Sequence, residues 1–267
     1  MNQMTIIAER INMTRKKMRE RIWDRDIDFV TSEIKKQEHM GATHIDINAG
    51  GDPSKEIEDM KWLTELVSKA TELPISFDSA NPDALKAGLE ICNRPGTIIN
   101  SITGEKSRIE NTLPLVIEYN THAIALTMDD NGMPPDLDAR IRVADNLVAL
   151  MKENDISLDR IHMDTLVQPV SSNPEQVAHT IAGINYIHEN YPDMHTMVGL
   201  SNVSYGVPRR IHMNRAFFVL LIQAGLDGAI IDNTADGMLG AMLATLAMLG
   251  KDEYCMNYIT AARAEKI

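Results

Sequence analysis

The sequence has few cysteines, no excess of basic residues and no long apolar run. Two cysteines among 267 residues, Cys92 and Cys255, are too few for a disulfide framework or a structural zinc site. The 26 Lys and Arg against 38 Asp and Glu give a net charge of −12, which argues against nucleic acid or an anionic membrane surface as a partner. No apolar stretch approaches the roughly 20 residues that span a bilayer. The N-terminal segment also lacks the pattern of a secretory signal, so we expect a globular, cytoplasmic protein.

Short apolar segments recur along the chain, and each is followed by a segment with helical spacing. The apolar segments alternate little with polar residues, which is typical of strands buried on both faces of a parallel sheet. They cover residues 5–7, 44–47, 75–77, 97–99, 123–127, 161–163, 197–200 and 229–231. The helical segments cover residues 27–40, 54–70, 83–91, 105–119, 137–151, 174–190, 214–224 and 236–249.

Eight strand–helix repeats in about 250 residues predict a (β/α)8 barrel, with residues 1–267 forming one domain. A doubly wound sheet fits less well, because the chain has neither a G-x-G-x-x-G motif nor a P-loop. The last predicted helix, over 236–249, is apolar on nearly every side but too short to cross a membrane. We expect this helix to be buried against the barrel and against a second copy of the chain, which predicts a homodimer.

The carboxyl ends of the predicted strands carry acids and amides. In a (β/α)8 barrel the active site lies at these ends. No lysine ends a strand, which disfavours Schiff-base chemistry, and the eight histidines lack paired metal-ligand spacing. We therefore expect no metal site, with Mg²⁺ bound by Asp46, Asp78 and Asp164 as a minor alternative. The polar residues at the strand ends are Glu9, Arg10, Asn12, Asp46, Asn48, Asp78, Ser79, Asn100, Ser101, Thr127, Asp129, Asp164, Asn202, Ser204, Asp232 and Asn233.

Carboxylates and carboxamides together suit a neutral heterocycle with a 2-aminopyrimidinone edge. The adjacent NH₂ and ring N–H donors of such an edge match the two oxygens of one carboxylate, while its carbonyl and ring nitrogens suit amide side chains. Pterins have this edge. The residues by themselves make a pterin one of several candidate ligands.

Seven motifs near the predicted strand ends occur in a characteristic order. They are AERIN (8–12), HIDINAG (44–50), SFDSAN (76–81), IINSITGE (98–105), HMDTL (162–166), GLSNVSYG (199–206) and RRIHMNR (209–215). With these motifs the chain resembles the pterin-binding methyltransferases, and most of all the stand-alone methyltetrahydrofolate–corrinoid methyltransferases. The resemblance covers essentially the whole chain. It implies a TIM barrel of the dihydropteroate synthase-like type that moves a methyl group between N5 of tetrahydrofolate and the cobalt of a corrinoid (cobalamin) protein.

The resemblance also implies roles for individual residues. Asn202 would be the catalytic residue near N5, with Ser204 and Tyr205 as further candidates beside it. Tyr205 stands where a relative carries Gln, and Asp164 is followed by Thr165 where relatives usually have Pro. The residues implied to bind or border the pterin are Asp78, Asn100, Asp164, Asp46, Asn48 and Arg210.

Methyl transfer of this kind needs a proton at N5. Cob(I)alamin that attacks the N5-methyl group must expel an amine, which leaves poorly unless N5 is protonated or strongly hydrogen-bonded. Asn202 cannot supply a proton at neutral pH. We therefore expect the proton to come from solvent, or through a water bridged to Asp46 or Asp164. The chain lacks a D-x-H-x-x-G corrinoid-binding motif and has no length left for a cobalamin domain. The corrinoid is therefore expected on a separate protein.

Two other functions remain open at this point. A dihydropteroate synthase-like enzyme would need Lys or Arg at the later strand ends for its pyrophosphate leaving group, and residues 199–204 and 231–233 offer none. A folate-binding barrel without catalysis, serving as a scaffold for a corrinoid protein, is compatible with every motif. At the level of single residues, Asp78 could instead cap the helix that follows it, and Glu9 and Arg10 could simply pair with neighbours across the barrel.

Overall fold

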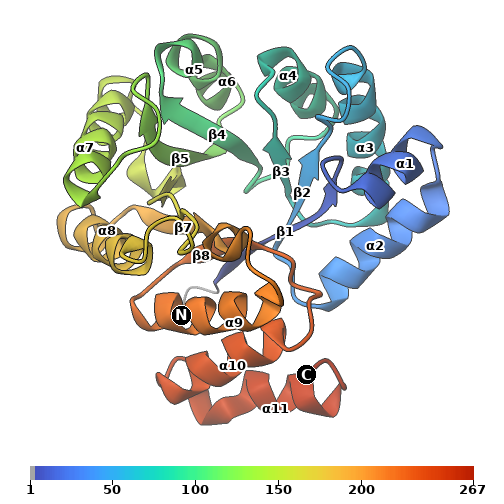
Figure 1. The fold of residues 1–267 in the computed structure, drawn as a ribbon. Helices are drawn as coiled ribbons and strands as arrows, with labels where there is room; N and C mark the ends of the chain where they lie inside the picture. Colours follow the sequence, from blue (N-terminus) through green and yellow to red (C-terminus); the bar gives the residue numbers. More distant parts are fainter. Residues whose placement is uncertain (1–3) are drawn as a thin grey trace.

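The computed structural model describes residues 4–267 and shows eight parallel strands that close into a barrel in the order β1 to β8 (Figure 1). Each strand pairs with the next along the chain, and β8 pairs with β1. All eight predicted strands are confirmed, with ends that differ by a few residues. The strands are β1 Thr5–Asn12, β2 His44–Asn48, β3 Ile75–Asp78, β4 Ile98–Gly104, β5 His122–Asp129, β6 Ile161–Asp164, β7 His195–Gly199 and β8 Gly228–Ile231.

The helices surround the barrel and mostly match the prediction (Figure 1). The single helix expected over 105–119 is wrong: two short helices meet at Thr112, because Pro114 has no N–H and its ring clashes with an earlier carbonyl. One helix begins at Arg210 rather than at residue 214, and α1 and α11 have no counterpart in the prediction. The helices are α1 Lys16–Trp23, α2 Ile27–His39, α3 Glu56–Ala70, α4 Pro82–Ile91, α5 Lys106–Asn111, α6 Leu113–Glu118, α7 Leu137–Glu153, α8 Gln176–Asn190, α9 Arg210–Gln223, α10 Met238–Met248 and α11 Met256–Arg263, with 3₁₀ turns η1 Leu158–Arg160, η2 Leu200–Ser204 and η3 Glu253–Cys255.

The alternation of side chains along each strand decides what the barrel encloses. Successive residues of a strand point to opposite faces, so Ile47 and Phe77 pack outward in a large apolar core shared with the helices. The residues that alternate with these along each strand point into the barrel. The barrel interior is polar at both of its ends and apolar at its centre. The buried side chains that fill the centre are Ile7, Ile98, Ile124 and Met197.

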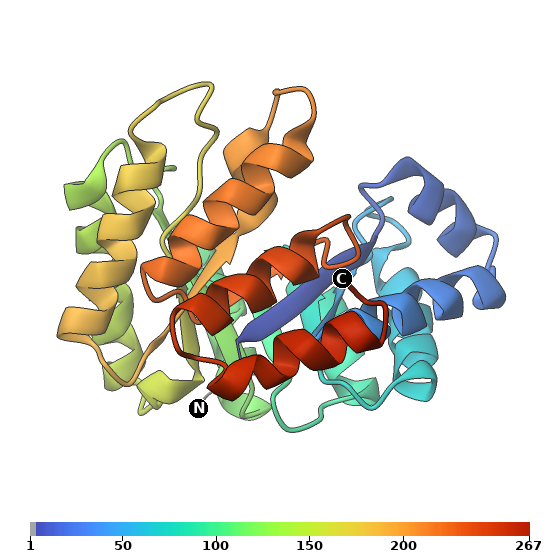
Figure 2. The ribbon, with the colours of Figure 1, turned by 90° about the horizontal axis from the view of Figure 1, so that it is seen from below.

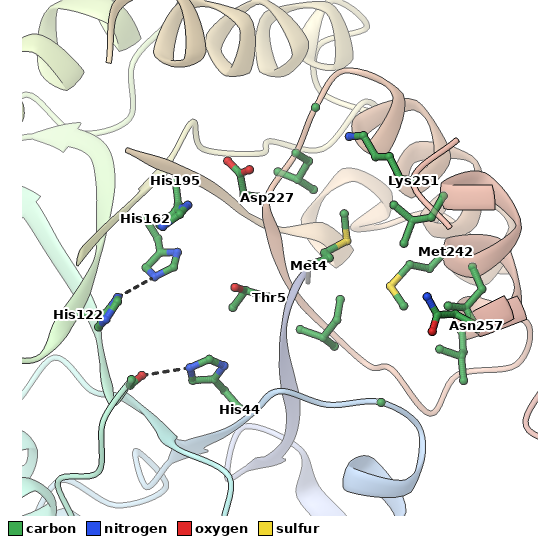
Figure 3. A pocket seen from close by; sticks show the side chains of 18 residues that line it. Met4, Thr5, His44, His122, His162, His195, Asp227, Met242, Lys251 and Asn257 are labelled. Carbon is green, nitrogen blue, oxygen red and sulfur yellow. Dashed lines mark hydrogen bonds between the residues drawn. The ribbon is translucent and has the colours of Figure 1, made fainter. Parts of the chain in front are cut away.

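Four histidines that are far apart in the sequence come together at the amino ends of the strands. They line a cavity of about 910 Å³ whose opposite wall includes Met242, Lys251 and Asn257 (Figure 3). No group of three or more His, Cys, Asp or Glu side chains within residues 4–267 has the geometry of a metal site. The four histidines are His44, His122, His162 and His195.

Burial makes the protonated form of three of these histidines unfavourable. It lowers the pKa of His44 to about 4, although a hydrogen bond with the Gly96 carbonyl opposes the shift. Burial also lowers the pKa of His122, and that of His162 falls well below its usual value. His122 Nδ1 and His162 Nε2 lie 3.3 Å apart, so one proton suffices for the pair. A second proton there would be buried beside the charge of the first.

The apolar helix near the C-terminus is only partly covered. α10 packs against α9, and α11 lies beside it (Figure 2). α11 therefore covers part of the helix that was expected to face a second copy of the chain. The end of α10 still leaves large apolar side chains in solvent, with Met248 78% and Leu249 40% exposed. None of the helices within residues 4–267 combines the length and hydropathy needed to cross a bilayer.

We predict that His44→Gln weakens the loss of stability in acid. His44 stays neutral in the folded protein down to about pH 4, whereas the unfolded chain binds a proton below its ordinary pKa of about 6.5. Its contribution is therefore present above pH 6.5 and lost as the pH falls towards 4, by at most about 3 kcal/mol. Urea unfolding across this pH range measures the loss, with His39→Gln at the exposed end of α2 as the control. Equal pH dependence in His44→Gln and wild type would contradict the prediction.

Candidate active site

Acids and amides converge at the carboxyl ends of β2, β3 and β4. In the parallel register Asn48 lies beside Asp78, and Asp78 lies beside Asn100. Asp46 lies deeper in the barrel, beside Ser76. All of them point inward because they alternate with residues that pack against the helices. The structure therefore brings four of the predicted site residues into one cluster.

Hydrogen bonds link the members of this cluster. Asn48 Nδ2 donates to Asp78 Oδ2 at 2.9 Å, and Ser76 Oγ donates to Asp46 Oδ1 at 2.7 Å. Asn100 Nδ2 also donates to Asp46 Oδ1, at 3.4 Å. Each acid is thus oriented by an amide or hydroxyl group from a neighbouring strand.

The alternative role of Asp78 as a helix cap is wrong. Asn81 caps α4, since its Oδ1 accepts the backbone N–H of Asp83 at 3.0 Å. Ser79 and Asn81 are in turn tied to Glu56 of α3. Because the loop after β3 supplies its own cap, the carboxyl group of Asp78 is left facing the barrel mouth.

Burial makes both carboxyl groups of the cluster hard to ionise. It raises the pKa of Asp46 well above its usual value, and the nearby carboxyl of Asp78 raises it further. Burial also raises the pKa of Asp78, although the Asn48 amide and the Arg108 guanidinium oppose the shift. A ligand that donates two N–H groups to one carboxylate would replace the solvation lost on burial. The pair therefore suits an uncharged ring rich in N–H donors.

Asp164 ends β6 on the other side of the barrel mouth. It is buried, its Oδ1 accepts the N–H of Leu166 at 2.7 Å, and burial raises its pKa to about 6. Thr165 points away from the barrel, because a Cβ built on Gly183 of α8 would lie 3.0 Å from Thr165 Cγ2. The departure from the usual Asp-Pro-Leu pattern therefore lies behind the strand end and not in the pocket wall.

Asn202 is exposed in the 3₁₀ turn η2, directly after β7. Gly199 permits a close approach of this turn to the strand end, because a Cβ there would lie 3.1 Å from Asn202 Nδ2. Ser204 is fully buried behind the turn. Its hydroxyl donates to Asn214 Oδ1 at 2.6 Å and accepts from Arg210 Nε at 2.9 Å. Ser204 therefore supports the turn from behind while Asn202 faces the mouth.

Two further residues that the resemblance implies at the site, Arg210 and Tyr205, lie farther out. Arg210 begins α9, and its guanidinium also donates to the backbone carbonyl of Ser201. Tyr205 is 68% exposed beyond the turn. Arg210 thus fixes the turn that carries Asn202, and Tyr205 lies on the open rim of the barrel.

An ion-pair network joins β1 to the end of β8, and sequence reasoning finds only part of it. Arg10 pairs with Glu33 at 2.6 Å and with Asp232 at 3.1 Å, which confirms that Arg10 pairs with neighbours. Arg15, in the loop after β1, reaches Asp232 at 3.1 Å and Glu9 at 3.4 Å. Sequence reasoning misses Arg15 because it lies beyond the strand end, where its positive charge is the only local signal.

Comparisons with known proteins identify the family of this chain. Residues 8–232 match the family model described as pterin binding enzyme. The chain belongs to the pterin-binding enzyme family. This pterin-binding enzyme is 35% identical over 266 residues to methylcorrinoid:tetrahydrofolate methyltransferase of Eubacterium limosum, across 99% of this chain and 98% of that protein. It is 30% identical over 239 residues to methionine synthase of Mycobacterium tuberculosis, across 85% of this chain but 20% of that much longer protein.

Solved structures share the fold of this pterin-binding enzyme. The 7,8-dihydropteroate synthase of Vibrio fischeri superimposes with a TM-score of 0.72 at 14% identity, across 93% of this chain and 94% of that one. The dihydropteroate synthase of Xanthomonas albilineans, in complex with 7,8-dihydropteroate, gives a TM-score of 0.66 at 15% identity, across 92% and 94%. The expected dihydropteroate synthase-like type of TIM barrel is confirmed, and at this identity the likeness concerns the fold alone.

We predict that Asp164→Asn stabilises the protein at alkaline pH. The folded pKa of about 6 lies above the unfolded value of about 3.9, so the stability that Asp164 contributes in acid is lost as the pH rises through 6. Asparagine keeps an acceptor for the Leu166 N–H but has no charge to bury. Urea unfolding at about pH 8 should show a gain of up to about 3 kcal/mol that vanishes near pH 4.

The exposed Asp193→Asn provides the control for this measurement. It should leave the free energy of unfolding unchanged at both pH values. A destabilised Asp164→Asn at pH 8 would show that the hydrogen bond to Leu166 outweighs the cost of burying the charge.

Proposed function

We propose that this chain catalyses methyl transfer between N5 of tetrahydrofolate and the cobalt of a corrinoid carried by a separate protein. The chain is a methyltransferase of the pterin-binding enzyme family. The observation that carries the proposal is the inward cluster of acids and amides in a chain that is 35% identical, over nearly its full length, to a methylcorrinoid:tetrahydrofolate methyltransferase. A cytoplasmic location stays a prediction.

The cluster has the donors and acceptors that a pterin ring needs. Asp78, oriented by Asn48, accepts from the adjacent NH₂ and ring N–H groups of the pterin. Asn100 and Asp46 lie close by and interact with the remaining polar edge. Asp164 binds the ring from the other side of the mouth. The buried acids ionise when the ring supplies their missing hydrogen bonds, so binding and ionisation are coupled.

The methylated nitrogen must face the open end of the barrel. Asn202 is exposed there, on a turn held by Ser204 and Arg210. Its carboxamide can donate to N5 or accept from it, and so interacts with this atom in both charge states of the reaction. The fixed turn and the bound ring hold N5 in line with an approaching cobalt. This alignment of the two reactants contributes the larger part of the rate gain.

The corrinoid is a substrate of this reaction and arrives on its own protein. In the forward direction the cobalt attacks the methyl carbon, the bond from N5 to that carbon breaks, and N5 takes up a proton. In reverse N5 loses the proton and attacks the methyl group on cobalt. We assign no protein-bound metal to this chain.

We also propose that the chain forms a homodimer through the apolar surface between α10 and α11. Met248, Tyr254 and Met256 are 78%, 84% and 54% exposed there, and monomers rarely leave such side chains grouped in water. Light scattering should give the mass of two chains for the wild type and of one chain for Met248→Glu, with methyl transfer retained. A wild-type mass of one chain would contradict the dimer.

Transfer of the methyl group from methyltetrahydrofolate to free cob(I)alamin, followed by cobalt absorbance, tests the proposed function. We expect turnover that depends on the protein. A non-catalytic scaffold would bind the folate in titration calorimetry and give no transfer. A dihydropteroate synthase-like enzyme would instead condense a pterin pyrophosphate with an arylamine.

Two variants should separate ring binding from catalysis. Asp78→Ala removes charge-assisted hydrogen bonds of about 1.5–3 kcal/mol, so folate should bind roughly 10- to 150-fold more weakly. Asn202→Ala should bind folate nearly as well as wild type but transfer the methyl group at least about tenfold more slowly in a single turnover.

Asn190→Ala, at the exposed end of α8, is the matched control and should change neither quantity. Thermal melts check that each variant is folded. Unchanged folate affinity in Asp78→Ala would remove that residue from the site, and a wild-type rate in Asn202→Ala would remove its catalytic role.

A further inference from the structure

Glu9 is an inward-facing acid that lies outside the ring-binding cluster, by which we mean Asp46, Asn48, Asp78 and Asn100. It follows Ile7 by two residues on β1, and Ile7 belongs to the apolar centre of the barrel, so both side chains point inside. The side chain of Glu9 is 18% exposed, which leaves it in contact with the barrel mouth. It is therefore placed to exchange a proton both with solvent and with a bound substrate.

The surroundings of Glu9 come from the strands and turns on one side of the mouth. Arg15 Nη2 lies 3.4 Å from Glu9 Oε1, and Arg15 also pairs with Asp232. The charge of Arg210 and the hydroxyl of Ser201 act on the same carboxyl group, and Glu9 in turn raises the pKa of the neighbouring Asp46 of β2. Since Ser201 precedes Asn202 in η2, Glu9 lies behind the turn that faces N5.

A small cavity lies beside both Glu9 and this turn. Its volume is about 30 Å³, which is enough for one water molecule, and the polar side chains in its otherwise apolar lining can supply the hydrogen bonds that a buried water needs. A water in this position would contact both the carboxyl group and the base of η2. The residues that line the cavity are Glu9, Leu200, Ser201, Asn214, Ile231, Asp232, Ala235 and Met238.

The electrostatic environment keeps Glu9 close to half-protonated at neutral pH. Burial raises its pKa to about 7; Arg15 opposes the shift and Asp232 adds to it. A proton donor and acceptor works best when its pKa is near the working pH. The acids of the ring-binding cluster accept hydrogen bonds from amide and hydroxyl groups, and Asp164 accepts one from the backbone of Leu166. Asp232 is paired with Arg10 and Arg15.

We propose that Glu9 holds the proton exchanged with N5, and that a water in the small cavity passes it by way of the η2 turn. This proposal rests on the proposed methyl transfer. In the forward direction the electron pair of cob(I)alamin forms the bond from cobalt to the methyl carbon, and the bond from that carbon to N5 breaks. N5 keeps the pair of the broken bond and takes the proton that Glu9 gives up, so Glu9 becomes a carboxylate. The reverse reaction returns the proton to Glu9.

The pH dependence of single-turnover methyl transfer to cob(I)alamin tests this role. In the wild type the forward rate should fall as the pH rises through about 7, because only protonated Glu9 can donate. Glu9→Gln keeps the size of the side chain but has no transferable proton. We expect its rate at pH 6 to fall at least about tenfold and its profile to lose the inflection near pH 7, with folate affinity within about twofold of wild type.

Glu105→Gln is the matched control, because Glu105 is also a half-buried acid at the mouth but follows β4 on the other side. It should keep the inflection of the wild type. A Glu9→Gln profile that keeps the inflection, or a loss of equal size at every pH, would overturn the role of Glu9 and leave the proposed function standing. A wild type that transfers no methyl group at any pH would overturn the proposed function and this role with it.

Discussion

The burial of carboxyl groups inside a closed barrel is the constraint on which the rest of the structure depends. Strand alternation forces every second side chain into a narrow interior, and this chain fills the centre with Ile and Met but the mouth with acids. An ionised carboxylate there is unfavourable unless donors compensate it. The raised pKa of Glu9 and of Asp164 expresses that cost. A ring with N–H donors removes part of it, so the feature that weakens the free protein favours the bound state.

The two ends of the barrel meet the same constraint with different groups. At the amino end the inward positions hold imidazoles, such as His44 and His162, which donate and accept hydrogen bonds while neutral. At the carboxyl end they hold acids, whose ionised form is disfavoured by burial. The apolar side chains between them keep the two polar ends apart. Acid therefore destabilises the amino end through protonated histidine, while alkaline pH destabilises the carboxyl end through ionised carboxylates.

Much of the fold and part of the site could be predicted because their signals are local. Each strand is a short apolar run, and each inward acid at its end, such as Asp78, is visible one residue later. Pro114 is also a local signal, because it indicates a break that the prediction of one helix over 105–119 did not take into account. The surroundings of a side chain could not be predicted in this way. Glu9, for example, interacts with Asp232, which is more than 200 residues away in the chain. No local pattern encodes such a meeting; only closure of the barrel creates it.

The fold by itself does not select the reaction, since dihydropteroate synthases adopt it at 14–15% identity. A shared ring-binding cluster would explain a common pterin, but the chemistry at N5 depends on what lies above the ring. In the proposed reaction that position belongs to Asn202, whose amide cannot be ionised at neutral pH, while the proton resides on Glu9 behind the turn. This division keeps a charged carboxylate out of the path of the cobalt, where it would repel the electron-rich metal. In this proposal the proton moves through water behind the turn, so the mouth stays open to the cobalt while N5 is protonated.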